Sequence, residues 1–280
     1  MSTILNNWGY SLNFLLHTNK NHVIIIKDLV EQNITNKKSY PHRTKFELRS
    51  FEMAIKYTRQ QIIDTLEQSK GDMGAFYQKD FINYSGYTID TNELYTEVIS
   101  EWLTANFTLL ESIPFITRKN SYNTQTHHGL TERLTSNRLE ERIAMAMYRQ
   151  KGLPCLGLVM DYQTPLKDKS TSIAGKIDLL TYDGKVLRVM ELKEPDSKET
   201  MLRCVLEGFT YMKTAKIDKL IGDFQLPHDT KVQACPFVVF DGVQHKEMSG
   251  QKPHLHHLMK MLDCEPFFYE KTGDYYIVKQ

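Results

Sequence analysis

The chain has 280 residues, of which 41% are hydrophobic and 25% are charged, and this balance predicts an ordinary soluble protein of one large domain or two modest ones. Glycine and proline, at 14 and 9 residues, are too scarce for a fibrous or wholly disordered chain. Thirty-five basic residues against 34 acidic ones give a net charge of +1, which excludes a polycation that binds nucleic acid along its whole length.

The sequence contains no targeting or membrane signal that we can identify. It has no apolar run of about 18 residues, the length that a membrane-spanning helix needs, and its first residues lack the basic and apolar regions of a secretory signal. The four cysteines are far apart and form no Cys-x-x-Cys pair: Cys155, Cys204, Cys235 and Cys264. We therefore expect a cytoplasmic protein with reduced thiols and no membrane partner.

The N-terminal half is predicted to be mostly helical. Apolar residues recur at helical spacing over 46–66 and over 91–110. The β-branched run Val23–Ile26 fits either a strand or the start of a helix, and the aromatic segment 74–87 is ambiguous. No residue pattern in this half indicates a specific chemistry.

A polar, turn-rich segment at 120–128 is the expected domain boundary, dividing the chain into a helical region 1–128 and a second domain 129–280. Basic residues gather in the first region and are candidates to contact nucleic acid: Lys37, Lys38, Arg43 and Lys45. Charge alone supports this role, and a solvated surface is the alternative interpretation.

The second domain is predicted to alternate helices with strands. The expected order between residues 137 and 240 is helix, three strands, helix and strand: 137–150, 153–162, 173–182, 185–193, 195–214 and 232–240. Asp183-Gly184 predicts a type I′ hairpin turn between the second and third strands, and Pro236 predicts an edge strand or a bulge. A helix at 254–262 and a hairpin at 267–278 complete the chain.

Three charged residues stand out on the predicted hairpin. Glu191 and Lys193 are two positions apart, so their side chains project from the same face of a strand. Asp178 lies on the partner strand, and ordinary hairpin pairing brings it to that face. Charges among apolar strand residues must be paired or bind a metal ion. The alternative is an exposed ion pair on a plain surface hairpin.

The chemistry of the trio favours Mg²⁺. This cation takes a few carboxylate oxygens, retains several waters and accepts phosphate oxygens as further ligands. Asp178 and Glu191 supply such oxygens, and Mn²⁺ is the expected substitute. Lys193 adds a positive charge that can hold a water molecule or neutralise charge developing on a phosphate.

The segment 137–240 resembles the PD-(D/E)XK nuclease superfamily, which includes many restriction endonucleases and RecB-like nucleases. The similarity consists of the Gly175-x-x-Asp178 lead-in, the Glu191-Leu192-Lys193 strand and the predicted αβββαβ order. Ile177 stands where the family name has proline. The resemblance implies an α+β (α/β) fold with a restriction endonuclease-like core, namely a mixed sheet flanked by helices.

The resemblance also implies roles for individual residues. Asp178 and Glu191 match the metal-binding carboxylates, Lys193 matches the catalytic lysine, and the backbone carbonyl of Leu192 would be a further metal ligand. The family often has a glutamate on the first helix, and here Glu140 and Glu141 compete. Glu140 borders the apolar stripe of this helix, so we prefer it, although both can simply be solvated.

The second helix carries weaker signals. Glu207 and Tyr211 are four residues apart and share a helix face. The pair is similar to the Gln-x-x-x-Tyr element of RecB-like members, with Glu in place of Gln, and an ordinary helix is the alternative. Arg138 and Lys198 can contact phosphates or face solvent.

The sequence therefore predicts a Mg²⁺-dependent nuclease that hydrolyses phosphodiester bonds, with DNA the favoured partner and restriction, defence or repair as compatible settings. A binding module for nucleic acid or protein that retains the fold without catalysis is the main alternative, and a hydrolase of small phosphoesters is another. The oligomeric state stays open, with a homodimer as one candidate, because enzymes that cut both strands of a duplex often dimerise.

Overall fold

The computed structural model describes residues 56–124, 138–168 and 175–279, together with the backbone of four short strands near the N-terminus. The chain divides into two compact units, Met1–Met53 and Ala54–Gln280. The strands of the first unit form two antiparallel pairs, β1 (Ile4–Leu5) with β2 (Ser11–Leu12) and β3 (Leu15–Asn19) with β4 (His22–Ile26). The predicted basic cluster Lys37, Lys38, Arg43 and Lys45 lies outside the described residues.

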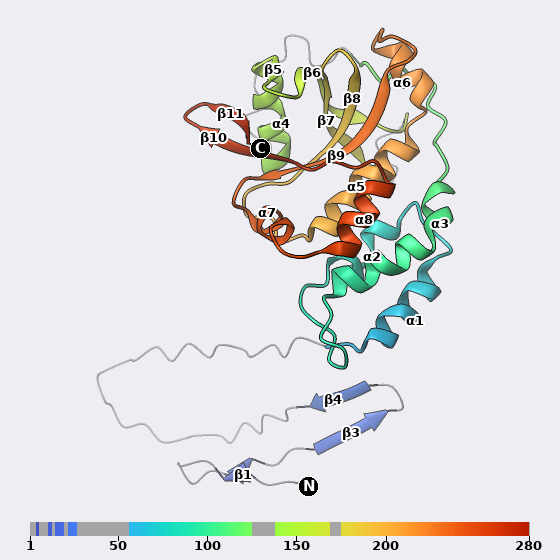
Figure 1. The fold of residues 1–280 in the computed structure, drawn as a ribbon, viewed down its shortest axis with the longest axis vertical. Helices are drawn as coiled ribbons and strands as arrows, with labels where there is room; N and C mark the ends of the chain where they lie inside the picture. Colours follow the sequence, from blue (N-terminus) through green and yellow to red (C-terminus); the bar gives the residue numbers. More distant parts are fainter. Residues whose placement is uncertain are drawn as a thin grey trace, which may run out of the picture. The chain divides into compact units, whose positions relative to one another are not determined.

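A seven-stranded mixed sheet forms the centre of the second unit (Figure 1). In spatial order its strands are β11 (Tyr275–Lys279), β10 (Phe267–Thr272), β9 (Lys231–Val239), β8 (Val186–Leu192), β7 (Lys176–Tyr182), β6 (Gly157–Pro165) and β5 (Gly152–Leu153). Strands β8, β9 and β10 are parallel, and the other neighbours are antiparallel. Helices together with this sheet make the coarse fold class α+β, as the sequence predicts.

Two helices pack on this sheet and define its two faces. Helix α4 (Leu139–Arg149) packs against β6 and β7, and helix α5 (Met201–Thr214) packs against β8 and β9. Alternate residues of β8 belong to different cores, with Val189 in the core of α5 and Met190 in the core of α4. The period of two then places Glu191 on the same face as Val189, towards α5.

The other helices are α1 (Arg59–Ser69), η1 (Phe76–Gln78), η2 (Asp80–Asn83), α2 (Tyr95–Ala105), α3 (Phe107–Glu111), α6 (Ile217–Asp223), α7 (Val243–Met248) and α8 (Pro253–Met261). Of these, η1, η2 and α7 pack against α5, whereas α1, α3 and α8 pack against α2. Helix α2 packs against both α1 and α8, so this compact unit includes residues on both sides of the expected boundary at 128. Within the described residues, no helix is long and apolar enough to cross a membrane.

The main correction to the predicted elements concerns the start of α5. The sequence predicts a helix from residue 195, but α5 begins at Met201 because Thr200 is its N-cap, with extended backbone and a side chain that accepts a hydrogen bond from Arg203 N at 3.2 Å. Residues 194–200 are therefore a connector without regular helix. This connector holds Glu199 beside the charged hairpin residues.

Two further predictions are wrong in detail. Pro236 lies on β9, an interior strand, and not at an edge; the pairing of β9 with β10 starts one residue later, at Phe237, so the missing N–H of proline precedes that ladder. The hairpin turn is not type I′, because Gly184 has a φ of 97° but Asp183 has no positive φ. Asp183 Oδ1 instead accepts hydrogen bonds from Lys185 N and Val186 N, both at 2.9 Å.

Candidate functional site

Asp178 and Glu191 lie next to each other where β7 and β8 approach the first turn of α4. The hairpin register pairs Leu179 with Met190, so the two acidic residues are one step further along the same antiparallel ladder. Both residues are buried, with 9% and 3% of their surface exposed. Leu192 N donates a hydrogen bond to Asp178 Oδ2 at 3.0 Å. The structure thus brings together the two carboxylates that the alternation of strand residues placed on one face.

Gln163, which the sequence did not single out, fixes the other oxygen of Asp178. Its side-chain amide donates to Asp178 Oδ1 at 2.8 Å, and its φ of 51° is in the left-handed region, although the residue lies within β6. A non-glycine residue held in this conformation is strained, and such strain gathers at functional sites. The contact depends on the pairing of β6 with β7, so no local sequence pattern could have indicated it.

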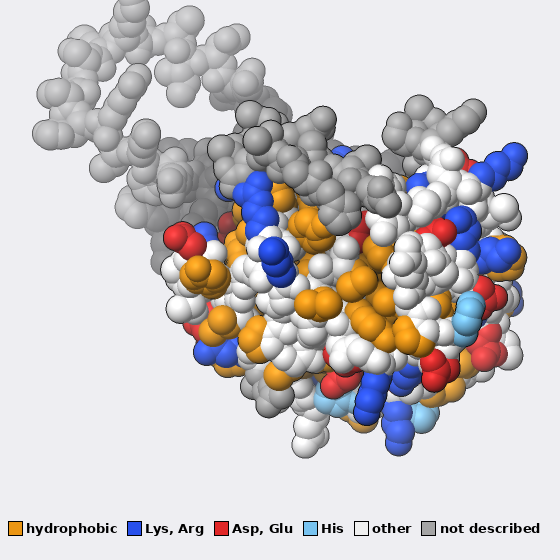
Figure 2. Space-filling model, turned by 90° about the horizontal axis from the view of Figure 1, so that it is seen from above, with side chains coloured by type: hydrophobic (Ala, Val, Ile, Leu, Met, Phe, Trp, Pro, Cys, Tyr) orange, Lys and Arg blue, Asp and Glu red, His pale blue; other side chains and the backbone are white. Residues whose placement is uncertain are grey.

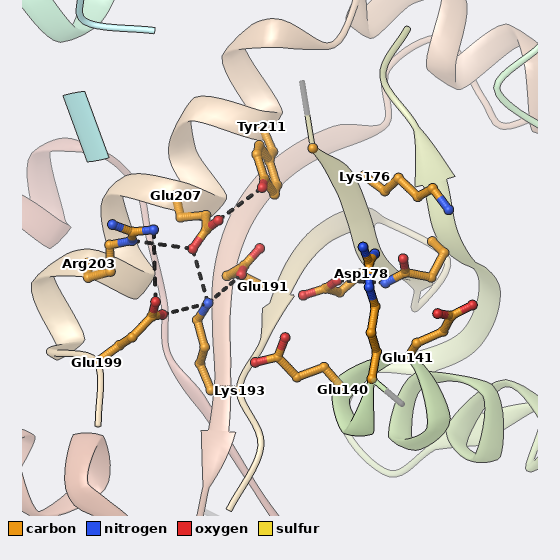
Figure 3. A pocket seen from close by; sticks show the side chains of 13 residues that line it. Glu140, Glu141, Lys176, Asp178, Glu191, Lys193, Glu199, Arg203, Glu207 and Tyr211 are labelled. Carbon is orange, nitrogen blue, oxygen red and sulfur yellow. Dashed lines mark hydrogen bonds and ion pairs between the residues drawn. The ribbon is translucent and has the colours of Figure 1, made fainter. Parts of the chain in front are cut away.

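Lys193 is surrounded by three carboxylates (Figure 3). Its ammonium lies 2.8 Å from Glu191 Oε1, 2.7 Å from Glu199 Oε2 and 3.0 Å from Glu207 Oε2. The ammonium donates hydrogen bonds to Glu191 Oε1 and Glu207 Oε2, whereas its contact with Glu199 Oε2 is an ion pair without a hydrogen bond. The predicted pair of Glu191 and Lys193 is therefore part of a larger charged network.

Burial and mutual repulsion dominate the electrostatics of the carboxylates. Burial raises the pKa of Asp178 to about 7, although the Lys193 ammonium opposes the shift. Burial, together with the neighbouring Asp178 and Glu207 carboxylates, raises the pKa of Glu191 well above its usual value. Burial would also raise the pKa of Glu207, but Lys193, Arg203 and Tyr211 together outweigh it and lower that pKa. The nearby positive charge of Lys193 therefore does not compensate for the burial of the Asp178 and Glu191 carboxylates.

The same carboxylates keep Lys193 protonated. Burial would lower the pKa of Lys193, but Glu191 and Glu207 outweigh this effect and raise the pKa above its ordinary value. Lys193 is therefore an ammonium at neutral pH, which can donate hydrogen bonds and neutralise negative charge. It cannot take a proton from water.

Both candidate glutamates of the first turn of α4 line the cavity above the hairpin. Figure 3 shows the carboxylate of Glu140 directed towards Lys193 and Asp178, whereas Glu141 lies on the far side of Asp178. Burial raises the pKa of Glu140, and Lys193 is the strongest influence that opposes this shift. The negative charge of Glu141 acts on Tyr162. The geometry therefore favours Glu140 as the site carboxylate of this helix.

Glu207 and Tyr211 of α5 hold Lys193 from the opposite side. Tyr211 Oη donates to Glu207 Oε1 at 2.9 Å, while Glu207 Oε2 accepts from Lys193. Gly175 packs directly on Tyr211, since a Cβ atom at this position would lie 2.1 Å from Tyr211 Oη. The glycine three residues before Asp178 therefore has a steric reason, which is the close approach of the tyrosine ring.

Glu199 and Arg203 complete the charged network around Lys193, and the sequence did not single them out either. Arg203 Nη2 lies 3.9 Å from Glu199 Oε1, and Arg203 Nε lies 3.6 Å from Glu207 Oε2. The spacing of Glu199, Arg203 and Glu207 at intervals of four residues is a sequence signal that could have found them.

The predicted basic contacts are only partly at the site. Arg138 and Lys176 line the cavity. Lys198 is exposed, and it does not belong to the part of the cavity lining that the structure describes. On the face shown in Figure 2, basic and acidic side chains are interspersed and do not gather by sign. Among the described residues, the basic side chains that line the cavity are those of Arg138, Lys176, Lys193 and Arg203.

The donor set fits a cation that needs few protein ligands. The cavity has a volume of about 520 Å³ and is lined mainly by charged side chains. Within residues 56–124, 138–168 and 175–279, no group of three or more His, Cys, Asp or Glu side chains is arranged to hold a metal ion. However, Glu191 Oε2 is buried without a hydrogen-bond partner among these residues, beside Asp178. Two carboxylates with one free oxygen suit Mg²⁺, which retains several waters.

Comparison of the chain with family models, with curated proteins and with solved structures found no match.

Proposed function

We propose that this protein is a Mg²⁺-dependent nuclease that hydrolyses phosphodiester bonds, with DNA as the expected substrate. One observation carries the proposal: Asp178 and Glu191 are adjacent and buried, and Glu191 Oε2 has no hydrogen-bond partner among the described residues. Buried carboxylates in this state are costly unless a cation stabilises them. The order of α4, three antiparallel strands, α5 and β9 supports the resemblance to PD-(D/E)XK nucleases and a restriction endonuclease-like core.

Asp178, Glu191 and the backbone carbonyl of Leu192 are the groups that would hold Mg²⁺, or Mn²⁺ in its place. When bound, the cation would polarise a phosphoryl oxygen and lower the pKa of a water molecule. Gln163 and Leu192 N orient Asp178 for this role through their hydrogen bonds to its two oxygens.

Lys193 acts in this proposal as a fixed positive charge. As an ammonium it would donate a hydrogen bond to the attacking water or to a phosphate oxygen, and it would stabilise negative charge in the transition state. Glu207, held by Tyr211, keeps the ammonium in place. Glu140 would support the water network from the opposite side of the cavity.

A gel assay tests the proposal directly. Supercoiled, linear and single-stranded DNA and an RNA are incubated with Mg²⁺, with Mn²⁺ or with EDTA. We expect cleavage of at least one DNA with either cation and none in EDTA, and we expect Asp178→Asn to abolish it while Glu111→Gln, at an exposed position on α3, does not. Cleavage in EDTA, or an active Asp178→Asn protein, would contradict the assignment. A homodimer is the accompanying proposal, tested by sedimentation.

A second candidate is a non-catalytic binding module with the same fold. The observation that favours it is the occupation of Lys193, which donates hydrogen bonds to Glu191 and Glu207 and makes an ion pair with Glu199. Calorimetry with Mg²⁺ and Mn²⁺ separates the two functions. A protein that binds neither ion, even with a DNA oligonucleotide present, would support the module and remove the basis of the nuclease.

A further inference from the structure

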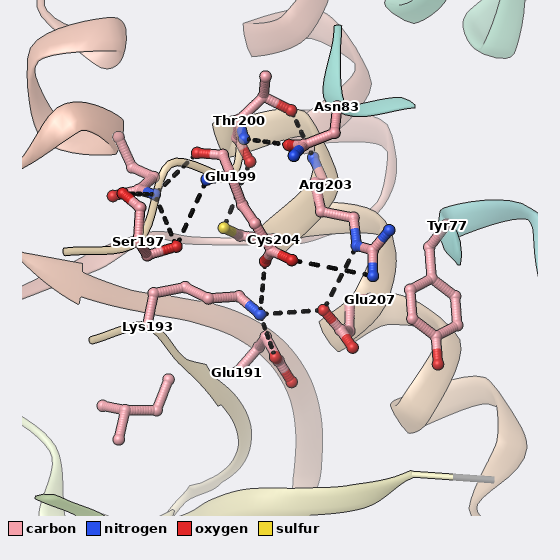
Figure 4. A network of polar contacts seen from close by, with 12 residues as sticks. Tyr77, Asn83, Glu191, Lys193, Ser197, Glu199, Thr200, Arg203, Cys204 and Glu207 are labelled. Carbon is pink, nitrogen blue, oxygen red and sulfur yellow. Dashed lines mark hydrogen bonds and ion pairs between the residues drawn. The ribbon is translucent and has the colours of Figure 1, made fainter. Parts of the chain in front are cut away.

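The Glu199 carboxylate lies between two cations, Lys193 and Arg203 (Figure 4). Its Oε2 is 2.7 Å from Lys193 Nζ and its Oε1 is 3.9 Å from Arg203 Nη2. An ammonium and a guanidinium on either side of one anion form the pair of groups that proteins use to bind phosphate. Glu199 therefore occupies a position whose chemistry suits a phosphate group.

Of the three carboxylates around Lys193, Glu199 is the one most easily displaced. The side chains of Glu191 and Glu207 are 4% and 10% exposed, and the two residues lie on the regular elements β8 and α5. The side chain of Glu199 is 29% exposed and belongs to the connector that precedes α5. Solvent access lowers the cost of moving a charged side chain into water.

The backbone on both sides of the Glu199 side chain is held by hydrogen bonds, so we expect the carboxylate to leave by a change of side-chain rotamer. Gln244 Nε2 donates to Glu199 O at 2.7 Å, and Asn83 Oδ1 accepts from Thr200 N at 2.7 Å.

Arg203 retains other supports when Glu199 turns away. Its guanidinium carbon lies 5.1 Å from the centre of the Tyr77 ring, in a cation–π contact. Its Nε lies 3.6 Å from Glu207 Oε2 and is buried with no hydrogen-bond partner among the described residues. The guanidinium therefore keeps its contacts with Tyr77 and Glu207 when Glu199 turns away.

We propose that Lys193 and Arg203 form a phosphate-binding subsite, which the Glu199 carboxylate occupies until a backbone phosphate of the nucleic acid replaces it. The identity of the ligand rests on the proposed nuclease function; the competition between carboxylate and phosphate does not. Glu199 thereby lowers the affinity of the site for phosphate, because only the fraction of molecules with the side chain turned away can bind it.

Fluorescence anisotropy with a short labelled single-stranded DNA in EDTA tests the subsite without requiring cleavage. We expect Glu199→Gln to bind this DNA about tenfold more tightly than the native protein. Glu194→Gln removes the same charge from the same connector and is the matched control, with an expected change within about twofold. An oligonucleotide with an uncharged methylphosphonate backbone should show no gain.

The double variant Glu199→Gln/Arg203→Gln should lose most of the gain, because it removes the guanidinium that receives the phosphate. Equal affinities of the native protein and Glu199→Gln would overturn the proposal, as would an equal gain in Glu194→Gln or a gain that survives loss of Arg203. Thermal melts confirm that each variant is folded. A Glu199→Gln protein that binds more tightly but cleaves nothing with Mg²⁺ would retain the subsite and reject the nuclease.

Discussion

Glu191 Oε1 lies 2.8 Å from the Lys193 ammonium, while the other oxygen of the same carboxylate is buried with no hydrogen-bond partner among the described residues. A buried carboxylate satisfied on one side only is unfavourable for folding. Asp178 adds a second negative charge beside it, which raises the pKa of Glu191 beyond the effect of burial. One cation can stabilise both groups, and this imbalance determines how the protein should respond to pH, metal and mutation.

Asp178 should destabilise the metal-free protein at high pH. Its pKa is about 7 in the folded protein against 3.8 for the free side chain, so between these values the folded state binds more protons than the unfolded state. Stability from this group therefore falls as pH rises from about 4 to 7, by a total on the order of 4 kcal/mol. We expect Asp178→Asn to be more stable than the native protein at pH 8 in EDTA, measured by urea denaturation.

The same comparison at pH 4 is the control. At pH 4 the folded state is almost fully protonated at Asp178 and the unfolded state is protonated to roughly 40%, so only a small part of the penalty is present and the advantage of Asp178→Asn should nearly vanish. An advantage that is independent of pH would show that the asparagine acts through packing and not through charge.

Metal binding should release protons near neutral pH. Asp178 and Glu191 both have raised pKa values, so a cation can bind them only when their protons leave. Calorimetry with Mn²⁺ at pH 6.5, in two buffers of different ionisation enthalpy, should give heats that differ between the buffers, and the difference should shrink at pH 8.5. Heats that do not depend on the buffer, with Mn²⁺ bound, would contradict the assigned ligands.

The charged hairpin could be predicted because strand geometry is local. A period of two places Glu191 and Lys193 on one face whatever surrounds them, and the return of the chain at Asp183-Gly184 brings Asp178 alongside. The coarse α+β class follows from the same alternation of helices and strands.

The rest of the site depends on contacts between distant segments. Gln163 reaches Asp178 only because β6 pairs with β7, and no local sequence pattern indicates its positive φ. Glu199 reaches Lys193 only because α5 begins at Met201, a boundary set by the Thr200 cap and obscured by the helix-compatible residues before it. The i, i+4 spacing of Glu199, Arg203 and Glu207 can be recognised in the sequence. Spacing alone does not reveal that the two carboxylates share the Lys193 ammonium.

Gly175→Ala should damage the site through Tyr211. The added methyl group would lie 2.1 Å from Tyr211 Oη, so the ring must move and its hydrogen bond to Glu207 must break. We expect a loss of about 1–3 kcal/mol in unfolding free energy and slower cleavage, measured by denaturation and by the gel assay. Gly71→Ala is the matched control, because a Cβ there meets nothing within 4 Å. Equal behaviour of the two alanine variants would show that the contact with Tyr211 is unimportant.

Gln163→Leu should weaken metal binding in a pH-dependent way. The substitution keeps the volume but removes the donor to Asp178 Oδ1, which disfavours the ionised carboxylate and raises its pKa further. Mn²⁺ affinity, measured by calorimetry, should therefore fall at pH 6.5 and partly recover at pH 8.5. Gln60→Leu, at an exposed position on α1, should leave both affinities unchanged. A loss for Gln163→Leu that is the same at both pH values would indicate displacement of the ligand and not a change in its ionisation.

Lys193→Met should separate catalysis from metal binding. The substitution removes a positive charge that competes with the cation for Glu191, so Mn²⁺ should bind at least as tightly as to the native protein. Cleavage should nevertheless fall by about 10²-fold or more, as expected for the loss of a positioned charge that stabilises the transition state.

Three carboxylates would also lose their shared partner in Lys193→Met, at a cost of about 3–5 kcal/mol of folding stability at pH 8 and less at pH 5, where the carboxylates can take up protons. Lys198→Met, at an exposed position outside the cavity lining, is the control and should change cleavage by less than about twofold. If a folded Lys193→Met protein binds Mn²⁺ and cleaves DNA at the native rate, Lys193 has no part in the chemistry.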